Sequence, residues 1–394
     1  MRKSDDKVAI VGIGEVPTGR HADKAAITFG LESAKMAIRD AGIHKDDIDF
    51  CMPTAALFSP PFNTELVTCR IVEELGLKNC KKNCQVFAGG SSSSCGLQMA
   101  RALIQSGAAK NILFVHSDKL GTGVTAQGGI DLFSTAGISA EWEVPYGQHY
   151  STIAAMTTTR YKYETGCTDE ELAAVCVSNR KWAEKNPNAF FRKPLTVEEV
   201  MASKMLSTPL RAKMSNMLFD GGAAFVITSA ERARDLTDTP VYVLGEGGAV
   251  THFVYSQEPD LARFGWAEAA RQAFEEAGLT PGDIDVAEIY DSYPIFQMIG
   301  LEELGFCGRG EGGKLFARGD TWPGGRLPCT TNGGMLSQGH TGAGGAVALM
   351  VEAVRQLMGK AGERQVADAR FAVETACGGT YMDAQVTVLG NQIP

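Results

Sequence analysis

The sequence predicts a mixed α/β fold made of two similar halves and an inserted segment that covers them. Three observations lead to this prediction: apolar strands alternate with amphipathic helices, a short motif recurs once, and the segment between the two copies lacks the repeat. Alternating strands and helices are typical of sheets covered by helices, and we expect largely parallel strands. The duplication favours two similar halves that pack face to face.

The repeat is defined by matching residues at a constant offset. Ala41-Gly42 is followed by Asp47-Ile48-Asp49, and Ala277-Gly278 is followed by Asp283-Ile284-Asp285, so the offset is 277 − 41 = 236. In each copy an amphipathic helix ends, a polar loop follows, and a short apolar strand begins. The expected helices are residues 26–41 and 261–277, and the expected strands are residues 50–53 and 286–290.

Each half continues with a glycine-rich turn, a helix and a strand. The first turn, Gly89-Gly90-Ser91, precedes a helix that reaches residue 106, and residues 342–345 precede a helix that reaches residue 358. The strands that follow are residues 111–116 and 370–374. These elements again occupy corresponding places in the two halves.

The boundaries of the repeat divide the chain into three parts. We expect an N-terminal half at residues 1–117, an inserted domain at 118–235 and a C-terminal half at 236–394. The insertion carries two helical patterns, at residues 151–165 and 169–186. A segment that covers two sheets is a common way to build a substrate tunnel.

Composition and charge exclude several classes of function. The chain has 394 residues, is 44% hydrophobic, and has a net charge of −9 without a block of like charges. This argues against a nucleic-acid partner and against a basic membrane-binding face. No apolar run approaches the length of a membrane span, and the N-terminal residues lead directly into a strand. We therefore expect a cytoplasmic protein.

The ten cysteines are scattered and mostly lie in apolar segments, where Cys behaves as a small hydrophobic residue. Cys80 and Cys84 are close in sequence, but no second Cys/His pair follows them. We therefore expect no metal site, and disulfides are not expected in a reducing cytosol.

The most informative segment is the glycine-rich run Asn332–Gly345, which contains His340 and precedes an amphipathic helix at residues 346–358. Glycines such as Gly342 let backbone approach a ligand closely. A helix N-terminus offers unpaired N–H groups and a positive dipole to an anionic oxygen. An imidazole at this place joins a proton carrier to an oxyanion site.

Together these features resemble the thiolase superfamily, in the branch of sterol-carrier-protein thiolases and thiolase-like lipid-transfer proteins. The resemblance covers nearly the whole chain. It rests on the glycine-rich histidine loop and on four further motifs, which are Val286-Ala287-Glu288-Ile289-Tyr290-Asp291-Ser292-Tyr293, Asn186-Pro187-Asn188-Ala189, Pro194-Leu195-Thr196-Val197-Glu198-Glu199-Val200 and Phe219-Asp220-Gly221-Gly222-Ala223-Ala224.

The resemblance implies a thiolase fold, which is a duplicated five-layered αβαβα arrangement with an inserted covering loop domain. It implies acyl-CoA and free coenzyme A as substrates, and no covalently bound cofactor. It also implies a homodimer core and a small partner subunit with a zinc ribbon and an OB-fold.

One family feature is missing. Family thiolases carry a nucleophilic Cys at the start of the helix that ends near residue 106, and this position is Gly90 here. Three residues remain as alternative nucleophiles: Cys84 in the preceding strand, Cys95 more than a turn into the helix, and Ser91, which is a poor nucleophile without a base. We expect instead that no acyl-enzyme forms.

A second family cysteine, an acid/base near the C-terminus, corresponds to the segment Ala376-Cys377-Gly378-Gly379-Thr380. Counting back from Ala384 places the catalytic position on Ala376, whereas the Cys-Gly-Gly pattern places it on Cys377. A one-residue bulge would reconcile the two. Gly379 is a candidate substrate-binding residue of this turn.

The remaining residues still support chemistry on an acyl-CoA. His340 can act as a base near neutral pH, and Tyr290 offers a phenol proton at a position where other members have His or Asn. The backbone N–H groups of Gly89, Gly90 and Ser91 can bind the thioester oxygen. A pocket without the Cys side chain also has room for a bulky acyl group or for the thiol of coenzyme A.

Three functions remain open. The first is thiolytic (reverse Claisen) cleavage of a 3-oxoacyl-CoA, which a histidine base suits. Resemblance to the 2-benzoylsuccinyl-CoA thiolases of anaerobic toluene degradation implies cleavage to benzoyl-CoA and succinyl-CoA. The second is retro-aldol cleavage of a 3-hydroxyacyl-CoA, because thiolase-like aldolases of steroid side-chain breakdown share the cysteine-less Gly-Gly-Ser pattern. The third is a non-catalytic acyl-CoA- or lipid-binding subunit.

Overall fold

Strands and helices alternate along the chain. The computed structural model describes residues 7–54, 67–125, 127–128 and 137–394. Its strands are β1 (Val8–Glu15), β2 (Phe50–Pro53), β3 (Lys82–Asn83), β4 (Asn111–Lys119), β5 (Met205–Ser207), β6 (Leu210–Arg211), β7 (Asp220–Ser229), β8 (Val241–Val250), β9 (Val286–Glu288), β10 (Phe371–Gly378) and β11 (Asp383–Gly390). Its α-helices are α1 (Ala26–Asp40), α2 (Val67–Leu75), α3 (Ser92–Gln105), α5 (Tyr150–Thr165), α6 (Asp169–Ala183), α7 (Val197–Met201), α8 (Ala230–Leu236), α9 (Trp266–Ala277), α10 (Pro294–Glu303), α11 (Gly312–Arg318), α12 (Gly334–Ser337) and α13 (Gly345–Leu357).

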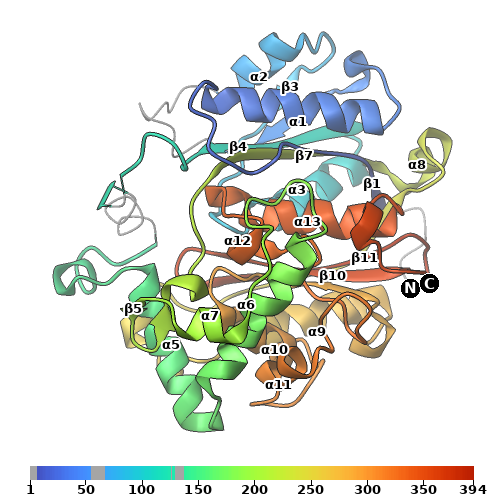
Figure 1. The fold of residues 1–394 in the computed structure, drawn as a ribbon. Helices are drawn as coiled ribbons and strands as arrows, with labels where there is room; N and C mark the ends of the chain where they lie inside the picture. The colour runs from blue at the N-terminus through green and yellow to red at the C-terminus, as the bar shows by residue number, and fades with distance from the viewer. Residues whose placement is uncertain (1–6, 55–66, 126, 129–136) are drawn as a thin grey trace.

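These elements stack as five layers, as Figure 1 shows. Helices α1 and α2 cover one outer face, and α9 and α10 cover the other. Helices α3 and α13 lie between the two sets of strands and contact strands of both halves. The predicted αβαβα layering is confirmed.

The strands form one continuous sheet of nine strands, in the order β3-β2-β4-β7-β1-β8-β11-β10-β9. The two halves join where β1 pairs with β8, through Ala9 opposite Tyr242 and Ile10 opposite Val241. The expectation of largely parallel strands is wrong. Strand β2 is parallel to β3 and β4, and β10 is parallel to β9, but every other pairing in this sheet is antiparallel. Strands β10 and β11 are antiparallel because only a short turn connects them.

The duplication is visible in how each half packs a helix on a strand. A Cβ on Gly12 of β1 would lie 2.3 Å from the Ala37 carbonyl oxygen of α1. A Cβ on Gly245 of β8 would lie 2.0 Å from the Ala273 carbonyl oxygen of α9. The two alanines are separated by the repeat offset, 273 − 37 = 236. Backbone therefore touches backbone at the same place in each half, which only glycine permits.

Most predicted elements lie where the sequence placed them. Helices α5 and α6 match the two helical patterns of the expected insertion, and α9 begins five residues later than expected, at Trp266. Strand β7 comes from the sequence assigned to the insertion but pairs with β4 and β1 in the sheet. The division at residues 117 and 235 stays a prediction.

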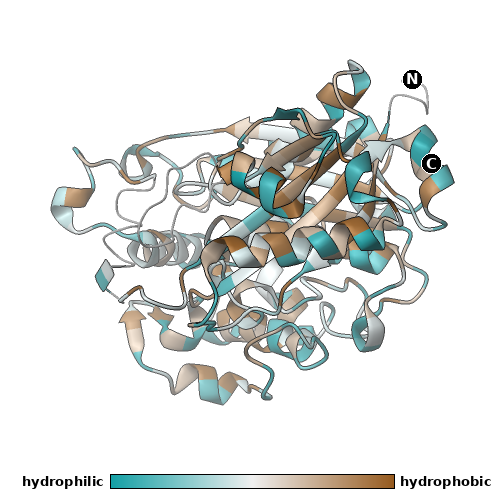
Figure 2. Ribbon diagram, turned by 90° about the horizontal axis from the view of Figure 1, so that it is seen from above, coloured by the Kyte–Doolittle hydropathy of each residue, from teal (hydrophilic) through white to brown (hydrophobic). Residues whose placement is uncertain are grey.

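The hydropathy of the elements follows this layering. Figure 2 shows the central strands coloured mainly as hydrophobic and the surface helices with alternating hydrophobic and hydrophilic turns. All eight residues of β1 are buried, and α1 buries Ala34 and Ala37 against the sheet. No helix in the described part of the chain has both the length and the apolar composition needed to cross a membrane.

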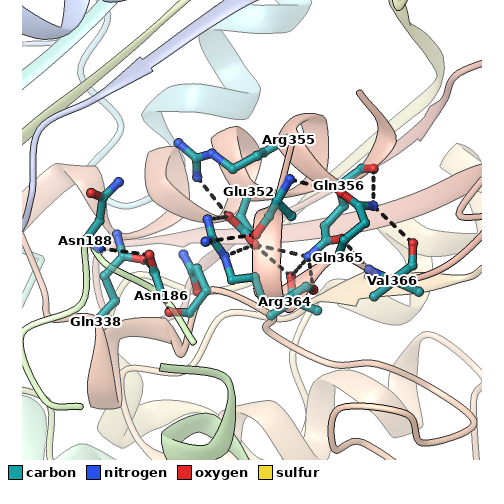
Figure 3. Close-up of polar contacts among 12 residues, drawn as sticks. Asn186, Asn188, Gln338, Glu352, Arg355, Gln356, Arg364, Gln365 and Val366 are labelled. Carbon is teal, nitrogen blue, oxygen red and sulfur yellow. Dashed lines mark hydrogen bonds and ion pairs between the residues drawn. The ribbon is translucent and has the colours of Figure 1, made fainter. Parts of the chain in front are cut away.

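Figure 3 shows a buried network of ion pairs around Glu352 of α13. The carboxylate of Glu352 accepts hydrogen bonds from Arg364 Nε at 2.7 Å, Arg364 Nη2 at 2.9 Å and Arg355 Nη1 at 2.8 Å. Burial alone would raise the pKa of Glu352, but the charges of Arg364 and Arg355 outweigh burial and hold it below its usual range. Arg355 also contacts Glu15 of β1 at 3.0 Å, so the network joins α13 to the first strand.

We expect Arg364→Met to lower the free energy of unfolding by about 3–5 kcal/mol, because it leaves the buried Glu352 carboxylate short of a partner. Chemical denaturation measures this change. Arg318→Met is the matched control: its guanidinium pairs with Asp320 on the surface, so its loss should cost less than about 1 kcal/mol. Equal losses in the two variants would contradict the assignment.

Candidate active site

A cavity of about 770 Å³ lies where loops of both halves meet the inserted segment. Seven of the predicted site residues line it, namely Gly89, Gly90, Tyr290, His340, Gly342, Cys377 and Gly379. The structure thus brings together residues that are up to 290 positions apart in the sequence (379 − 89). Ser91, the remaining predicted site residue, is fully buried outside the cavity wall.

The residues before β7 hold His340 in place. The N–H of His340 donates to the Met217 carbonyl at 3.0 Å, and the N–H of Phe219 donates to the His340 carbonyl at 2.8 Å. The same segment reaches the Tyr290 loop, because Asn216 Nδ2 donates to the Ser292 carbonyl at 2.7 Å. One short stretch of the inserted segment therefore fixes the spacing of the two predicted active-site loops.

The imidazole of His340 is buried and uncharged at neutral pH. Burial lowers its pKa to about 4, and a backbone hydrogen bond with Gly342 opposes this shift only in part. Its Nε2 has no hydrogen-bond partner among the described residues. The ring lies against Gly345, where a Cβ would be 2.9 Å from His340 Cδ2. His340 lines the cavity, and a neutral imidazole with an unpaired nitrogen is chemically able to accept a proton.

Polar contacts hold the histidine loop in position, and Figure 3 shows three of the residues involved, Asn186, Asn188 and Gln338. Gln338 Nε2 donates to Glu15 Oε1 at 2.6 Å, and Asn186 Nδ2 donates to Gln338 Oε1 at 3.0 Å. Asn188 Nδ2 donates to the other oxygen of Glu15 at 2.9 Å. The motif at residues 186–189, noted in the sequence without a defined role, thus positions the loop that carries His340.

A second buried pair, which sequence reasoning missed, lies under the same loop. Asp118 Oδ2 accepts the N–H of Ala343 at 3.0 Å, and a Cβ on Gly342 would lie 2.4 Å from this oxygen. His116 Nε2 lies 3.3 Å from Thr341 Oγ1, and burial lowers the His116 pKa to about 3. Both residues belong to β4, whose sequence is typical of a buried core strand. The sequence therefore gives no indication that they lie near the site.

The residues before α3 pack closely against the end of β10. A Cβ on Gly90 would lie 2.3 Å from the Cys377 carbonyl oxygen and 2.8 Å from the Tyr290 hydroxyl oxygen. A Cβ on Gly378 would lie 2.4 Å from the Ala88 carbonyl oxygen. The position that carries a nucleophilic cysteine in family thiolases therefore has no room for a side chain here, and the phenol of Tyr290 stands beside it.

Ser91 forms its hydrogen bonds within the protein. Its N–H donates to the Ala88 carbonyl at 3.1 Å, and its hydroxyl donates to the Asp383 carbonyl at 3.2 Å. These bonds occupy the N–H group that we expected to bind a thioester oxygen. Gly89 and Gly90 line the cavity, so they remain the candidate backbone donors for a ligand.

The strand pairing identifies the acid/base cysteine candidate. Strands β10 and β11 pair in continuous register, with Ala376 opposite Gln385 and Cys377 opposite Ala384, so no bulge is present. Cys377 lines the cavity, whereas Ala376 is fully buried and its carbonyl accepts from Trp266 Nε1. Burial, with the charges of Asp383 and Glu374, raises the pKa of Cys377 well above its ordinary value. Cys377 is therefore a neutral thiol that can donate a proton.

Four tyrosines line the cavity, and the sequence indicated two of them. Burial raises the pKa of Tyr290 well above its ordinary value, with smaller contributions from Cys377 and Tyr150. Tyr381 stacks on Phe296 at 3.6 Å, and its hydroxyl lies 2.7 Å from Ser292 Oγ. The cavity wall is thus rich in neutral phenols, as Tyr150 and Tyr293 also have raised pKa values through burial.

The other two candidate nucleophiles lie away from the cavity. Cys84 and Cys95 both pack against the core around α3 and do not line the wall. Burial raises the pKa of both thiols, that of Cys95 to about 12. A thiol in this state is a poor nucleophile. Within the described ranges, no three His, Cys, Asp or Glu side chains are grouped to hold a metal ion.

Comparison with known proteins identifies the family. A model described as thiolase C-terminal domain-like matches residues 247–391. An acetyl-CoA acetyltransferase of Methanothermobacter thermautotrophicus is 34% identical over 385 residues, which cover 97% of this chain and 98% of the relative. The chain belongs to the thiolase superfamily.

Further relatives place this thiolase-family chain more closely. Benzoylsuccinyl-CoA thiolase subunit BbsB of Thauera aromatica is 30% identical, covering 90% of each chain. Human sterol carrier protein 2 is 29% identical, covering 93% of this chain and 69% of its own, which supports the sterol-carrier-protein branch. The structure of an Ltp2-ChsH2(DUF35) aldolase superposes with a TM-score of 0.85 at 28% identity, covering 98% of each chain. The chain is a thiolase-like acyltransferase with a thiolase fold.

The low pKa of His340 predicts a particular pH dependence. Because the imidazole gains its proton only near pH 4, kcat/KM should show no acid limb between about pH 7.5 and 5.5. An unperturbed histidine would instead give a decline centred near pH 6.5. Rates measured across this range, with thermal stability recorded at each pH as the control, test the prediction.

The crowding around Gly90 predicts that any side chain there is harmful. Gly90→Ala should lower kcat/KM at least about tenfold, because the new methyl group displaces Cys377 or Tyr290. Gly90→Cys should not raise the rate. Gly282→Ala is the matched control, because its Cβ would meet only Thr280 Oγ1 at 3.6 Å. Wild-type rates in Gly90→Ala would contradict the described geometry.

Proposed function

We propose that this chain cleaves a 3-oxoacyl-CoA thiolytically, with the thiol of free coenzyme A as the direct nucleophile and without a cysteine acyl-enzyme. One observation carries the proposal: the histidine loop is intact and the buried His340 Nε2 has no hydrogen-bond partner among the described residues, while the place of the family nucleophile is filled by the Cys377 carbonyl and the Tyr290 phenol. The chain thus keeps the proposed base, His340, but lacks the cysteine nucleophile of family thiolases.

The reaction balances with the groups in the cavity wall. His340 Nε2 takes the proton of the coenzyme A thiol, and the sulfur attacks the 3-oxo carbon to give a tetrahedral oxyanion. The bond between C2 and C3 then breaks, and its electron pair forms the enolate of the departing acyl-CoA. The His340 imidazolium returns its proton to C2 directly, or the Cys377 thiol protonates C2 and the resulting thiolate takes up the proton that His340 holds. The products are a shortened acyl-CoA and a second acyl-CoA.

The first proton transfer needs stabilisation at the moment of attack. A thiol has an ordinary pKa near 8.5 and His340 one of about 4, so transfer between the separated groups costs roughly 6 kcal/mol. An imidazolium formed beside a thiolate recovers part of this cost, because opposite charges attract strongly in a water-poor cavity. We therefore place sulfur attack and proton transfer in one step.

The proposed acyl group is aromatic. The cavity has a volume of about 770 Å³, and the rings of Tyr150, Tyr290, Tyr293 and Tyr381 surround it. Aromatic rings pack favourably against one another in offset or edge-to-face arrangements. The relative BbsB is a subunit of benzoylsuccinyl-CoA thiolase, so 2-benzoylsuccinyl-CoA, giving benzoyl-CoA and succinyl-CoA, is the specific substrate that we propose.

We also propose that the chain works with a small partner subunit, which carries a zinc ribbon and an OB-fold, around a homodimer core. The support is the solved structure of an Ltp2-ChsH2(DUF35) aldolase, whose matched chain aligns over 98% of its own length with 98% of this chain. Experiments on activity should therefore use the chain co-expressed with this partner.

Retro-aldol cleavage is the second candidate, and the position of Tyr290 favours it. A base would take the proton of a 3-hydroxyl group, the C2–C3 bond would break, and the phenol beside Gly90 would donate a hydrogen bond to the enolate oxygen. This reaction needs no second thiol. The third candidate, a non-catalytic acyl-CoA-binding subunit, gives no role to the free imidazole of His340.

One assay separates the three. The complex is incubated with 2-benzoylsuccinyl-CoA, and with a 3-hydroxyacyl-CoA, each with and without free coenzyme A. Benzoyl-CoA that forms only when coenzyme A is added supports thiolysis. Cleavage of the 3-hydroxy substrate without coenzyme A supports the aldolase. Saturable binding without product in any tube supports the non-catalytic candidate and contradicts the other two.

His340→Ala should abolish turnover, with a loss of at least about a thousandfold in kcat and an unchanged melting temperature, because the variant lacks the base. Cys84→Ser and Cys95→Ser are the matched controls and should keep most of the activity, since both thiols lie outside the cavity wall. A thousandfold loss in either cysteine variant would instead restore a covalent mechanism.

A further inference from the structure

Among the residues that the structure describes, Arg20 supplies the one permanent positive charge of the cavity wall. Among the described residues that line the cavity, the other ionisable groups besides thiols and phenols are His149, His340 and Asp383. Burial lowers the pKa of both histidines, so they stay neutral at pH 7. Asp383 already accepts a hydrogen bond from Gln385 Nε2 at 2.6 Å. The charge of Arg20 is therefore the group in this wall that best suits an anionic ligand.

The backbone on both sides of Arg20 is fixed by Asp220. Gly19 exchanges two backbone hydrogen bonds with Asp220, at 3.1 and 2.8 Å, and the N–H of His21 donates to Asp220 Oδ2 at 2.8 Å. The other oxygen of this fully buried carboxylate accepts the N–H groups of Gly121 and Thr122. Arg20 thus stands between two anchored residues, which limits the freedom that a ligand would have to remove.

Arg20 itself is exposed, and no ion pair or hydrogen bond involves its side chain in the described part of the chain. Other arginines of the chain differ in this respect: Arg355 and Arg364 pair with Glu352, and Arg309 pairs with Glu164 and Glu302. A guanidinium that is anchored at its backbone, unpaired at its head and placed in a cavity wall is suited to bind a carboxylate or phosphate through two parallel hydrogen bonds.

The turn that carries Arg20 also touches the histidine loop. A Cβ on Gly339, the residue before His340, would lie 2.8 Å from Thr18 Cγ2. Two residues of extended chain span at most about 7 Å, so the Arg20 backbone lies close to the loop of the proposed base. The pantetheine arm holds the phosphates of coenzyme A many bonds away from its sulfur. An anion near the reacting carbons is more readily a carboxylate of the acyl group.

We propose that Arg20 binds an anionic group of the acyl-CoA substrate, so that the enzyme prefers an acyl group with a free carboxylate. The chemistry of recognition, a guanidinium fork on anionic oxygens, is shared by a carboxylate and by the phosphates of coenzyme A, and the test separates these two sources. The ligand class, acyl-CoA, rests on the proposed function. The anionic group is inferred from the geometry of the cavity wall.

The test measures binding rather than turnover, so that it does not depend on which carbon–carbon bond is cleaved. Dissociation constants are determined by calorimetry for the complex with succinyl-CoA, with butyryl-CoA, which has an acyl chain of the same length without the carboxylate, and with coenzyme A alone. The variants are Arg20→Gln and Arg20→Lys. Arg39→Gln, an exposed arginine of α1 outside the cavity wall, is the matched control.

Arg20→Gln should weaken succinyl-CoA binding about tenfold to a hundredfold and leave butyryl-CoA and coenzyme A unchanged. Arg20→Lys should recover part of the loss, since it restores charge without the fork. Equal weakening of all three ligands would assign Arg20 to a phosphate of coenzyme A. Unchanged affinities in Arg20→Gln would overturn the proposal while leaving the proposed function intact, and a wild-type complex that binds none of the three would overturn both.

Discussion

The inner end of the cavity depends on close contact between two stretches of backbone. Just before α3, a Cβ on Gly90 would lie 2.3 Å from the Cys377 carbonyl oxygen, and at the end of β10 a Cβ on Gly378 would lie 2.4 Å from the Ala88 carbonyl oxygen. Gly137 approaches Gly379 in the same way. Because side chains are excluded here, the wall presents carbonyl and amide groups in fixed positions. The loss of the family cysteine follows from this geometry: the space that its side chain would need belongs to Cys377 and Tyr290.

The imidazole of His340, the thiol of Cys377 and the phenols around this contact are held in their uncharged forms. Burial lowers the pKa of His340 and raises that of Cys377 and of the surrounding phenols. Neutral donors and a neutral acceptor cost much less to bury than charged groups do, and they interact strongly when a ligand brings or develops charge. Arg20 and Asp383 lie in the cavity wall, whereas a separate network of charges, formed by Glu15, Arg355 and Glu352, lies behind the loops and does not line the cavity.

The sequence predicted those features that local patterns determine. Helical periodicity and the recurring motif located α1, α9 and the strands after them, and the glycine-rich run located His340. Features that depend on contacts between distant segments could not be predicted from the sequence. The pairing of β1 with β8, the internal bonds of Ser91 and the choice between Ala376 and Cys377 all follow from strand register. Arg20, Asp118 and Tyr381 gave no signal, because a lone polar residue in a loop or strand looks the same whether or not a cavity lies beside it.

The continuous sheet has a consequence for how the chain reaches its native state. The two halves join through β1 and β8, more than 230 residues apart (241 − 10), and α3 is tied to the second half by Arg101 with Glu246 and Ser94 with Glu374. Contacts between such distant residues are slow to form, because a long loop must close first. The walls of the cavity come from both halves, so the cavity cannot form before the two halves have docked. Local order in either half is therefore no guarantee of a competent site, and the final docking of the halves is the step that creates it.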